Sequence, residues 1–242
     1  MLARYLAEKR ISRSELIIAA IVNALPGYIA QGRSVLPITV PLIGVFGLLY
    51  YGLVLLADLV KSLLLLAVGC LILPKRELND IGTQAPSRAQ RPDLRQAFRN
   101  ALGSAGNAIP KILLTMIPVT FGVFVLINLG IFEYSAKHLC VVAHYFPIGL
   151  ESLPIVATRL VSPIGAYTMA GGLLAKGVLE GKDIVMALLV GTLLATVPNV
   201  RYLVPYYFGI FGPAIGTQLV IVSTLLRILV FAAIVGMISF LV

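Results

Sequence analysis

The sequence predicts an all-α integral membrane protein, a polytopic helical bundle that contains amphipathic in-plane helices and re-entrant or broken helices. The chain is 59% hydrophobic and only 12% charged, whereas a soluble domain is typically ~25% charged. Several of its apolar runs exceed the ~20 residues that a helix needs to cross a bilayer. Prolines and glycines interrupt the apolar runs of the second half. Such breaks survive at membrane depth only against protein or a water-filled cavity.

Residues 1–73 are expected to form an N-terminal in-plane helix and the scaffold transmembrane helices. Met1–Glu15 mixes charged and apolar residues and has no cleavage pattern. This fits either an amphipathic helix on the cytoplasmic membrane surface or a soluble extension. The first span is expected from Leu16 to Ala30, with a break at Pro26–Gly27.

The second apolar run, Val35–Leu73, contains Asp58 and Lys61 at a spacing that places both on one helix face. We favour one long tilted helix over two short crossings with these charges in the turn. Basic residues lie on both sides of the region, which implies an even number of spans, and no turn-forming residue is close to Asp58. In the single helix, the two charges form an intramembrane ion pair or face a neighbouring subunit.

Residues 74–100 form the long polar segment of the chain, expected to be a cytoplasmic loop that ends in an amphipathic helix from Asp93. Basic residues concentrate before the first span and between Lys75 and Lys111. The positive-inside rule therefore predicts a multi-pass protein of the cell membrane with a cytoplasmic N-terminus. This orientation accounts for the net charge of +9, so no nucleic acid is expected as a partner.

Residues 101–242 are expected to be a transmembrane domain with broken helices. A span over Ile109–Phe132 comes first. Proline or glycine then predicts breaks at Ser162–Pro163, Pro198–Asn199 and Gly212–Pro213.

Two of the broken stretches share an order of residues. Glu151–Pro154 precedes Arg159, and Thr196–Asn199 precedes Arg201. Paired interruptions in corresponding segments are the usual sequence pointer to a transport site. The solute-binding residues expected from these stretches are Glu151, Ser152, Arg159, Ser162, Thr196, Asn199 and Arg201.

Each of these residues also has a structural alternative. Glu151 could bind solute or a coupling ion, sodium or a proton, or it could cap the following helix. Asn199 could hydrogen-bond the edge of a heterocycle, or satisfy the backbone groups that Pro198 frees. Arg159 and Arg201 could hold an anionic group, or extend to lipid headgroups.

Three stretches of this second half, Gly103–Pro110, Ser162–Tyr167 with Gly171–Gly172, and Thr196–Asn199, resemble the nucleoside-recognition "Gate" domain. That domain occurs in concentrative nucleoside transporters, in the membrane part of bacterial ferrous-iron transporters and in spore-maturation membrane proteins. The resemblance implies re-entrant hairpins and unwound helices around a polar site for a nucleoside-like solute, and Tyr167 joins the expected binding residues. The chain has room for about one Gate unit, which makes a homodimer attractive.

The expected function is therefore that of a secondary-transporter-like protein that binds and moves a small polar solute within the lipid bilayer. The alternatives are a non-transporting membrane scaffold or subunit, in which the Asp58–Lys61 pair serves assembly, and a lipid-handling protein. No enzyme motif is present, so no catalytic residue is expected. No metal or cofactor is expected either, because the one candidate cluster has no recognised ligand spacing. Its members are Glu133, His138, Cys140 and His144.

Overall fold

The computed structural model describes residues 12–72 and 148–241 continuously, together with single residues between 106 and 146. Every regular element within these ranges is a helix. The predicted loop and in-plane helix of residues 74–100 lie outside the described residues, as do residues 1–11. The described residues from Gly106 to Asn128 are helical, in agreement with the predicted span over Ile109–Phe132, although the bounds of that helix are outside the description.

Helices α2 (Arg13–Val22) and α3 (Leu25–Ile43) form one interrupted segment of 31 residues that is long and apolar enough to cross a bilayer. Ser12 caps α2, and its hydroxyl accepts a hydrogen bond from the Glu15 amide at 3.2 Å. A short turn separates the two helices, and a proline lies in the first turn of α3, where its missing amide costs nothing. The break lies at Asn23–Ala24 and not at the predicted Pro26–Gly27, which are inside α3. The first span also continues well beyond its predicted end at Ala30.

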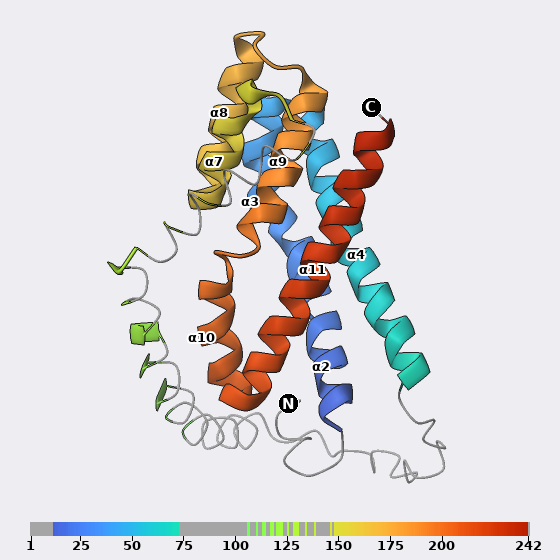
Figure 1. Cartoon of the computed structure of the whole chain (residues 1–242), viewed down its shortest axis with the longest axis vertical. Helices are drawn as coiled ribbons and strands as arrows, with labels where there is room; N and C mark the ends of the chain where they lie inside the picture. The colour runs from blue at the N-terminus through green and yellow to red at the C-terminus, as the bar shows by residue number, and fades with distance from the viewer. Residues whose placement is uncertain are drawn as a thin grey trace, which may run out of the picture.

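A turn at Gly44 reverses the chain between α3 and α4 (Val45–Ile72), and α4 returns beside α3 (Figure 1). Gly44 has φ +64°, a conformation that glycine adopts readily. The Tyr51 hydroxyl on α4 then donates to the carbonyls of Tyr28 and Ile29, each at 3.1 Å. The predicted continuous helix through Asp58 is confirmed, but its predicted start at Val35 is wrong because the reversal comes at Gly44.

The first broken element begins with the short 3-10 helix η3 (Leu150–Ser152) and continues as α7 (Leu153–Val161) and α8 (Pro163–Ala175). The two α-helices pack side by side around the predicted break (Figure 1). At that break, the Ser162 hydroxyl accepts a hydrogen bond from the Gly165 amide at 3.2 Å and so caps α8.

The second broken element consists of α9 (Gly181–Ala195) and α10 (Val200–Phe211), which are bent by 48° at the predicted break. Gly212, with φ +79°, reverses the chain, and α11 (Pro213–Leu241) returns beside α10 to the opposite end of the molecule (Figure 1). The breaks predicted at Pro198–Asn199 and Gly212–Pro213 are therefore confirmed.

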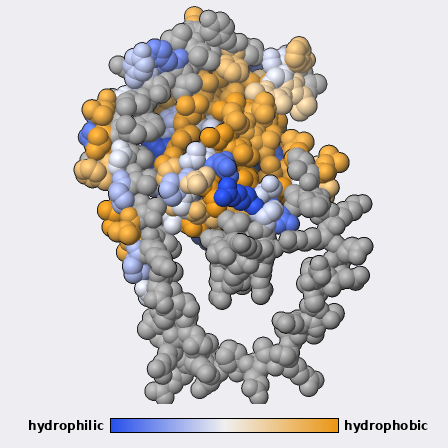
Figure 2. All heavy atoms as spheres, turned by 60° about the horizontal axis from the view of Figure 1, so that its bottom comes forward, coloured by the Kyte–Doolittle hydropathy of each residue, from blue (hydrophilic) through white to orange (hydrophobic). Residues whose placement is uncertain are grey.

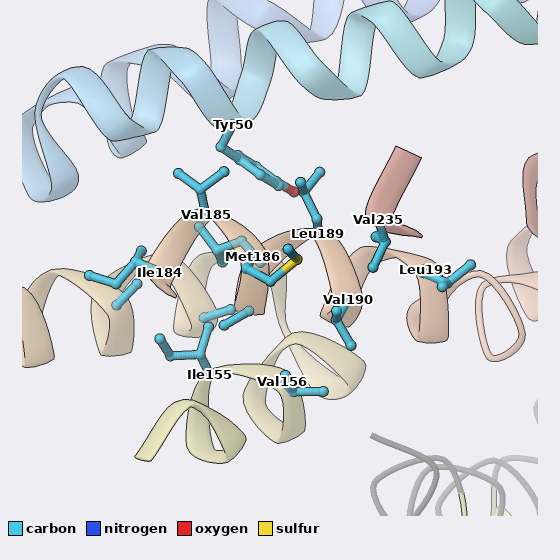
Figure 3. Close-up of a cluster of buried hydrophobic side chains, with 14 of the residues drawn as sticks. Tyr50, Ile155, Val156, Ile184, Val185, Met186, Leu189, Val190, Leu193 and Val235 are labelled. Carbon is cyan, nitrogen blue, oxygen red and sulfur yellow. The ribbon is translucent and has the colours of Figure 1, made fainter. Parts of the chain in front are cut away.

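Helix α9 is the centre of the core. Its residues from Ile184 to Ala195 are all buried, as expected of a helix that is apolar on every side. It packs against α4, α7, α8 and α11. Figure 3 shows Tyr50 reaching from α4 towards α9, with Ile155 and Val156 of α7 on the other side.

The outer surface is apolar where α4 faces away from the other helices. Six of its leucines are 44–56% exposed: Leu49, Leu56, Leu59, Leu63, Leu64 and Leu66. Much of the coloured surface in Figure 2 is hydrophobic. Within the described residues, three helical segments are long and apolar enough to cross a bilayer, or four if the bent α9–α10 pair counts as one. A water-soluble surface rarely carries apolar area on this scale, whereas lipid accommodates it.

Candidate functional site

The α2–α3 segment and the α9–α10 segment meet at a cavity of about 20 Å³ inside the helix bundle, and most of the residues that line it have polar side chains. Ala24, from the turn between α2 and α3, lines it together with Thr196 and Asn199 from the break between α9 and α10. Lys61 of α4 and Arg227 of α11 complete its charged lining. A cavity needs ~10–15 Å³ on this measure to hold a water molecule, so one water-sized group fits.

Lys61 forms an ion pair with Asp58 one helical turn away, with 2.7 Å between Lys61 Nζ and Asp58 Oδ1. Both residues are buried, at 3% and 1% exposure. The ammonium group also lies 4.5 Å from the centre of the Tyr28 ring, a distance typical of a cation–π contact. The two charges thus pair with each other inside one chain, although the second carboxylate oxygen of Asp58 is buried without a hydrogen-bond partner among the described residues.

Arg227 lines the cavity from α11. Its guanidinium lies 5.6 Å from the Tyr28 ring and 5.4 Å from the Phe231 ring. Among the described residues, neither its Nε nor the Thr224 hydroxyl one turn earlier has a hydrogen-bond partner, although both atoms are buried. Buried polar atoms without a partner are uncommon and costly in proteins.

The break that supplies Asn199 is held by backbone hydrogen bonds. Pro198 cannot bond the Leu194 carbonyl, which instead accepts from the Val197 amide at 3.3 Å. The Asn199 side chain makes no capping hydrogen bond. Its amide group is therefore available to the cavity. Thr196 donates to the Thr192 carbonyl at 3.1 Å and keeps its acceptor capacity.

A second polar cluster lies one turn earlier on α9, where the hydroxyl of Thr192 contacts side chains of α4 and α7. The Tyr50 hydroxyl is 2.9 Å from Thr192 Oγ1, and Arg159 Nε donates to the same oxygen at 3.3 Å. Arg159 also lies 5.9 Å from the centre of the Tyr167 ring. Of the carboxylates in the described ranges, none forms a salt bridge with Arg159, whose polar neighbours here are hydroxyl groups.

The other predicted site residues lie elsewhere. Glu151 and the buried Ser152 line an open hollow of about 690 Å³, which Glu180 and Asp183 share. Arg201 lies 4.7 Å from the Tyr202 ring, whereas Arg159 contacts Thr192 and Tyr167. Of the predicted site residues, Thr196, Asn199 and Lys61 thus line one cavity. The other predicted binding residues do not line it.

Five polar residues of the cavity lining were missed from the sequence: Tyr28, Tyr207, Ser223, Thr224 and Arg227. The available signal was Arg227 itself, because an ionisable residue inside an apolar helix marks a functional site by default.

Of the four residues weighed as a metal cluster, only His138 is described, and its Nδ1 lies 2.9 Å from the Tyr134 carbonyl. The described part of the chain contains no group of His, Cys, Asp and Glu side chains that could hold a metal ion.

Comparison with known proteins gives three relatives, all from Methanocaldococcus jannaschii. Uncharacterized protein MJ1556 is 32% identical over 232 residues, which cover 96% of this chain and 73% of the relative. Uncharacterized protein MJ0871 is 24% identical, over 95% of this chain and 71% of its own length. Uncharacterized protein MJ0880 is 21% identical, over 95% of this chain and 75% of its own length.

No family model matches the chain, so the resemblance to the Gate domain stays a prediction. No solved structure matches it either. The alignment with MJ1556 nevertheless extends over nearly all of this chain and almost three quarters of the relative. The chain belongs to the same protein family as MJ1556.

Proposed function

We propose that this chain is a polytopic protein of the cell membrane that works as a secondary transporter. It binds a small polar solute in the cavity between the α2–α3 segment and the α9–α10 segment. The observation that carries the proposal is the meeting of the α2–α3 turn and the α9–α10 break at one charged cavity. The other interruption predicted from the sequence, which begins at Glu151, lies at a separate hollow. In transporters, discontinuous helices form the substrate site near the middle of the bilayer. The α7–α8 hairpin is then a re-entrant element, because neither helix is long enough to cross alone.

The chemistry of the lining supports binding rather than packing alone. Ion pairs such as Asp58–Lys61 are expensive inside a bilayer and mark solute or ion pathways. Asn199 offers two donors and one acceptor, a set that suits the hydroxyl and amide groups of a nucleoside-like solute. Because its backbone neighbours are already hydrogen-bonded to one another, the side chain is free for a solute.

The remaining predictions about the working state extend this proposal. A cytoplasmic N-terminus, a homodimer and coupling to sodium or a proton stay predictions. The cavity as it stands admits one water-sized group, so a nucleoside-sized solute requires the helices around the break to separate. Such opening from one side at a time is the ordinary cycle of a secondary transporter.

Uptake by reconstituted vesicles tests the proposal. Detergent-purified protein is first screened by thermal unfolding against nucleosides, nucleobases and small dicarboxylates, since a bound solute raises the unfolding midpoint. The solute with the largest shift is then radiolabelled and offered to proteoliposomes. We expect uptake that Asn199→Ala abolishes and Asn23→Ala preserves, because Asn23 is exposed and does not line the cavity. Equal uptake by both variants would remove Asn199 from the site, and no uptake of any solute would refute transport.

The alternative roles make different predictions. A scaffold that uses the Asp58–Lys61 pair for assembly is disfavoured, because the pair is buried within one chain. Lipid handling by Arg159 is disfavoured because its side chain contacts Thr192 and Tyr167, both buried inside the molecule. Phospholipid that co-purifies with the protein and is lost in Arg159→Ala would favour lipid handling over solute transport.

A further inference from the structure

The cavity carries an excess of positive charge. Two cationic side chains line it, Lys61 and Arg227, and Asp58 neutralises only the first of them. No salt bridge to Arg227 is present among the described residues; its charged group rests against the Tyr28 and Phe231 rings instead. The balance of Asp58, Lys61 and Arg227 is therefore one positive charge.

Two hydrogen-bonding groups at the same wall lack partners. Arg227 Nε and Thr224 Oγ1 are buried, and each has no hydrogen-bond partner within the described part of the chain. Their residues are three positions apart on α11, so they share a helix face, and both line the cavity. An arginine nitrogen can only donate, and a hydroxyl can donate as well. What is missing at this wall is therefore an acceptor.

Together these features define the charge of the ligand group. The geometry points to an anion site: the cavity takes a single small anionic group, chloride or one carboxylate, which accepts hydrogen bonds from Arg227 and Thr224 and lies near the Lys61 ammonium. This inference rests on the proposed function in that it names the class of solute for the same cavity. It also places a sodium ion elsewhere, because a cation in this cavity would face two positive side chains.

The size of the cavity limits the ligand further. About 20 Å³ accommodates one water-sized group. A halide fits with little rearrangement, formate and acetate fit only if the lining side chains shift slightly, and a bulky hydroxylated anion such as gluconate does not enter. Arginine is well suited to this role because its rigid, permanently charged fork matches carboxylates and other anions.

The test compares anions at constant sodium concentration and ionic strength. Purified full-length protein is kept in sodium gluconate, whose anion is too large for the cavity, and the thermal midpoint is followed as chloride, formate or acetate replaces gluconate. We expect a saturable rise for the small anions. Arg227→Gln should abolish the rise, whereas Arg33→Gln should keep it, because Arg33 is exposed and lies away from the cavity. An equal rise in both variants would show a general salt effect and overturn the inference.

Thr224→Val keeps the test decisive if Arg227→Gln does not fold. This nearly isosteric change removes a buried hydroxyl that has no partner, so the midpoint in gluconate should rise rather than fall. The additional rise produced by chloride should become smaller, because the anion loses a donor. A chloride response equal to that of the unaltered protein would contradict the assignment.

The outcomes separate this inference from the transport proposal. If neutral nucleosides raise the midpoint and small anions do not, the solute site stands and the anion assignment fails. If anions bind through Arg227 but proteoliposomes take up no labelled chloride, formate or nucleoside, the anion site stands and transport fails. Uptake of labelled formate that is lost in Arg227→Gln and kept in Arg33→Gln would support both.

Discussion

Removing one member of the Asp58–Lys61 pair should destabilise the protein far more than removing both. The two groups are 2.7 Å apart and almost completely buried. Asp58→Leu therefore leaves the Lys61 ammonium without its counter-charge in the bundle interior. For buried pairs, such a loss costs about 3–5 kcal/mol.

The double variant Asp58→Leu/Lys61→Met should recover most of this loss. Two apolar side chains of similar length replace two charges whose burial was itself unfavourable, an exchange that is often neutral or stabilising. Burial of the Asp58 carboxylate is unfavourable here, because its second oxygen, Oδ2, is buried and has no hydrogen-bond partner among the described residues. We expect the double variant to lie within about 1–2 kcal/mol of the original protein on the same grounds.

The assay is the free energy of unfolding, measured by titration with SDS in mixed micelles. The exposed pair Lys182–Glu180, 3.7 Å apart with side chains 58% and 76% exposed, supplies the control. Lys182→Met should change the free energy by less than about 1 kcal/mol, as for other surface pairs. A loss below about 1 kcal/mol in Asp58→Leu, or a double variant no better than the single one, would refute a buried, coupled pair.

Two further predictions concern the packing around the core. A Cβ on Gly171 would lie 2.9 Å from the Leu42 carbonyl oxygen, whereas one on Gly172 would meet nothing within 4 Å. Gly171→Ala should thus cost about 1–3 kcal/mol in the same titration, and Gly172→Ala should be neutral or stabilising by up to about 1 kcal/mol; equal effects would contradict the close approach of α3 and α8. Tyr50→Phe removes the hydrogen bond to Thr192 at 2.9 Å and should lower the free energy of unfolding by about 1 kcal/mol. A loss of solute uptake without this loss of stability would instead assign Tyr50 to the solute pathway.

The sequence predicted the later helix breaks because each is caused by residues at the break itself. Pro163, Pro198 and Pro213 each begin or closely precede a new helix, and proline cannot continue the hydrogen bonding of the helix before it. Gly212 adopts the left-handed conformation that its lack of a side chain permits. These causes act within a few residues, so no knowledge of the tertiary structure is needed.

The break at Gly44 was missed because its neighbours gave stronger signals. Pro37 and Pro41 lie inside α3 without ending it, since packing against α4 and α8 supports the helix. Glycine inside an apolar run is tolerated in many helices. The sequence alone therefore cannot show which of these residues reverses the chain.

The cavity could be predicted only in part. Thr196 and Asn199 were found because they lie at a helix break, and Lys61 because a charge in an apolar run is expensive. Arg227 meets the same criterion. However, the sequence of an apolar helix with a single arginine is the same whether that side chain extends to the headgroups or turns into the bundle. The face that α11 presents to α2 and α4 decides between these, and that is a property of the packed bundle.

The accessibility of position 199 tests the central claim most directly. The protein is freed of its own thiols by Cys70→Ser and Cys140→Ser, given Asn199→Cys or Leu56→Cys, and exposed in vesicles to a small water-soluble methanethiosulfonate. Asn199 lines the cavity, whereas Leu56 is 45% exposed on the apolar outer surface. If the cavity is a solute site, Asn199→Cys reacts and Leu56→Cys does not. An unreactive thiol at position 199 under all conditions would show a closed packing defect and contradict the account.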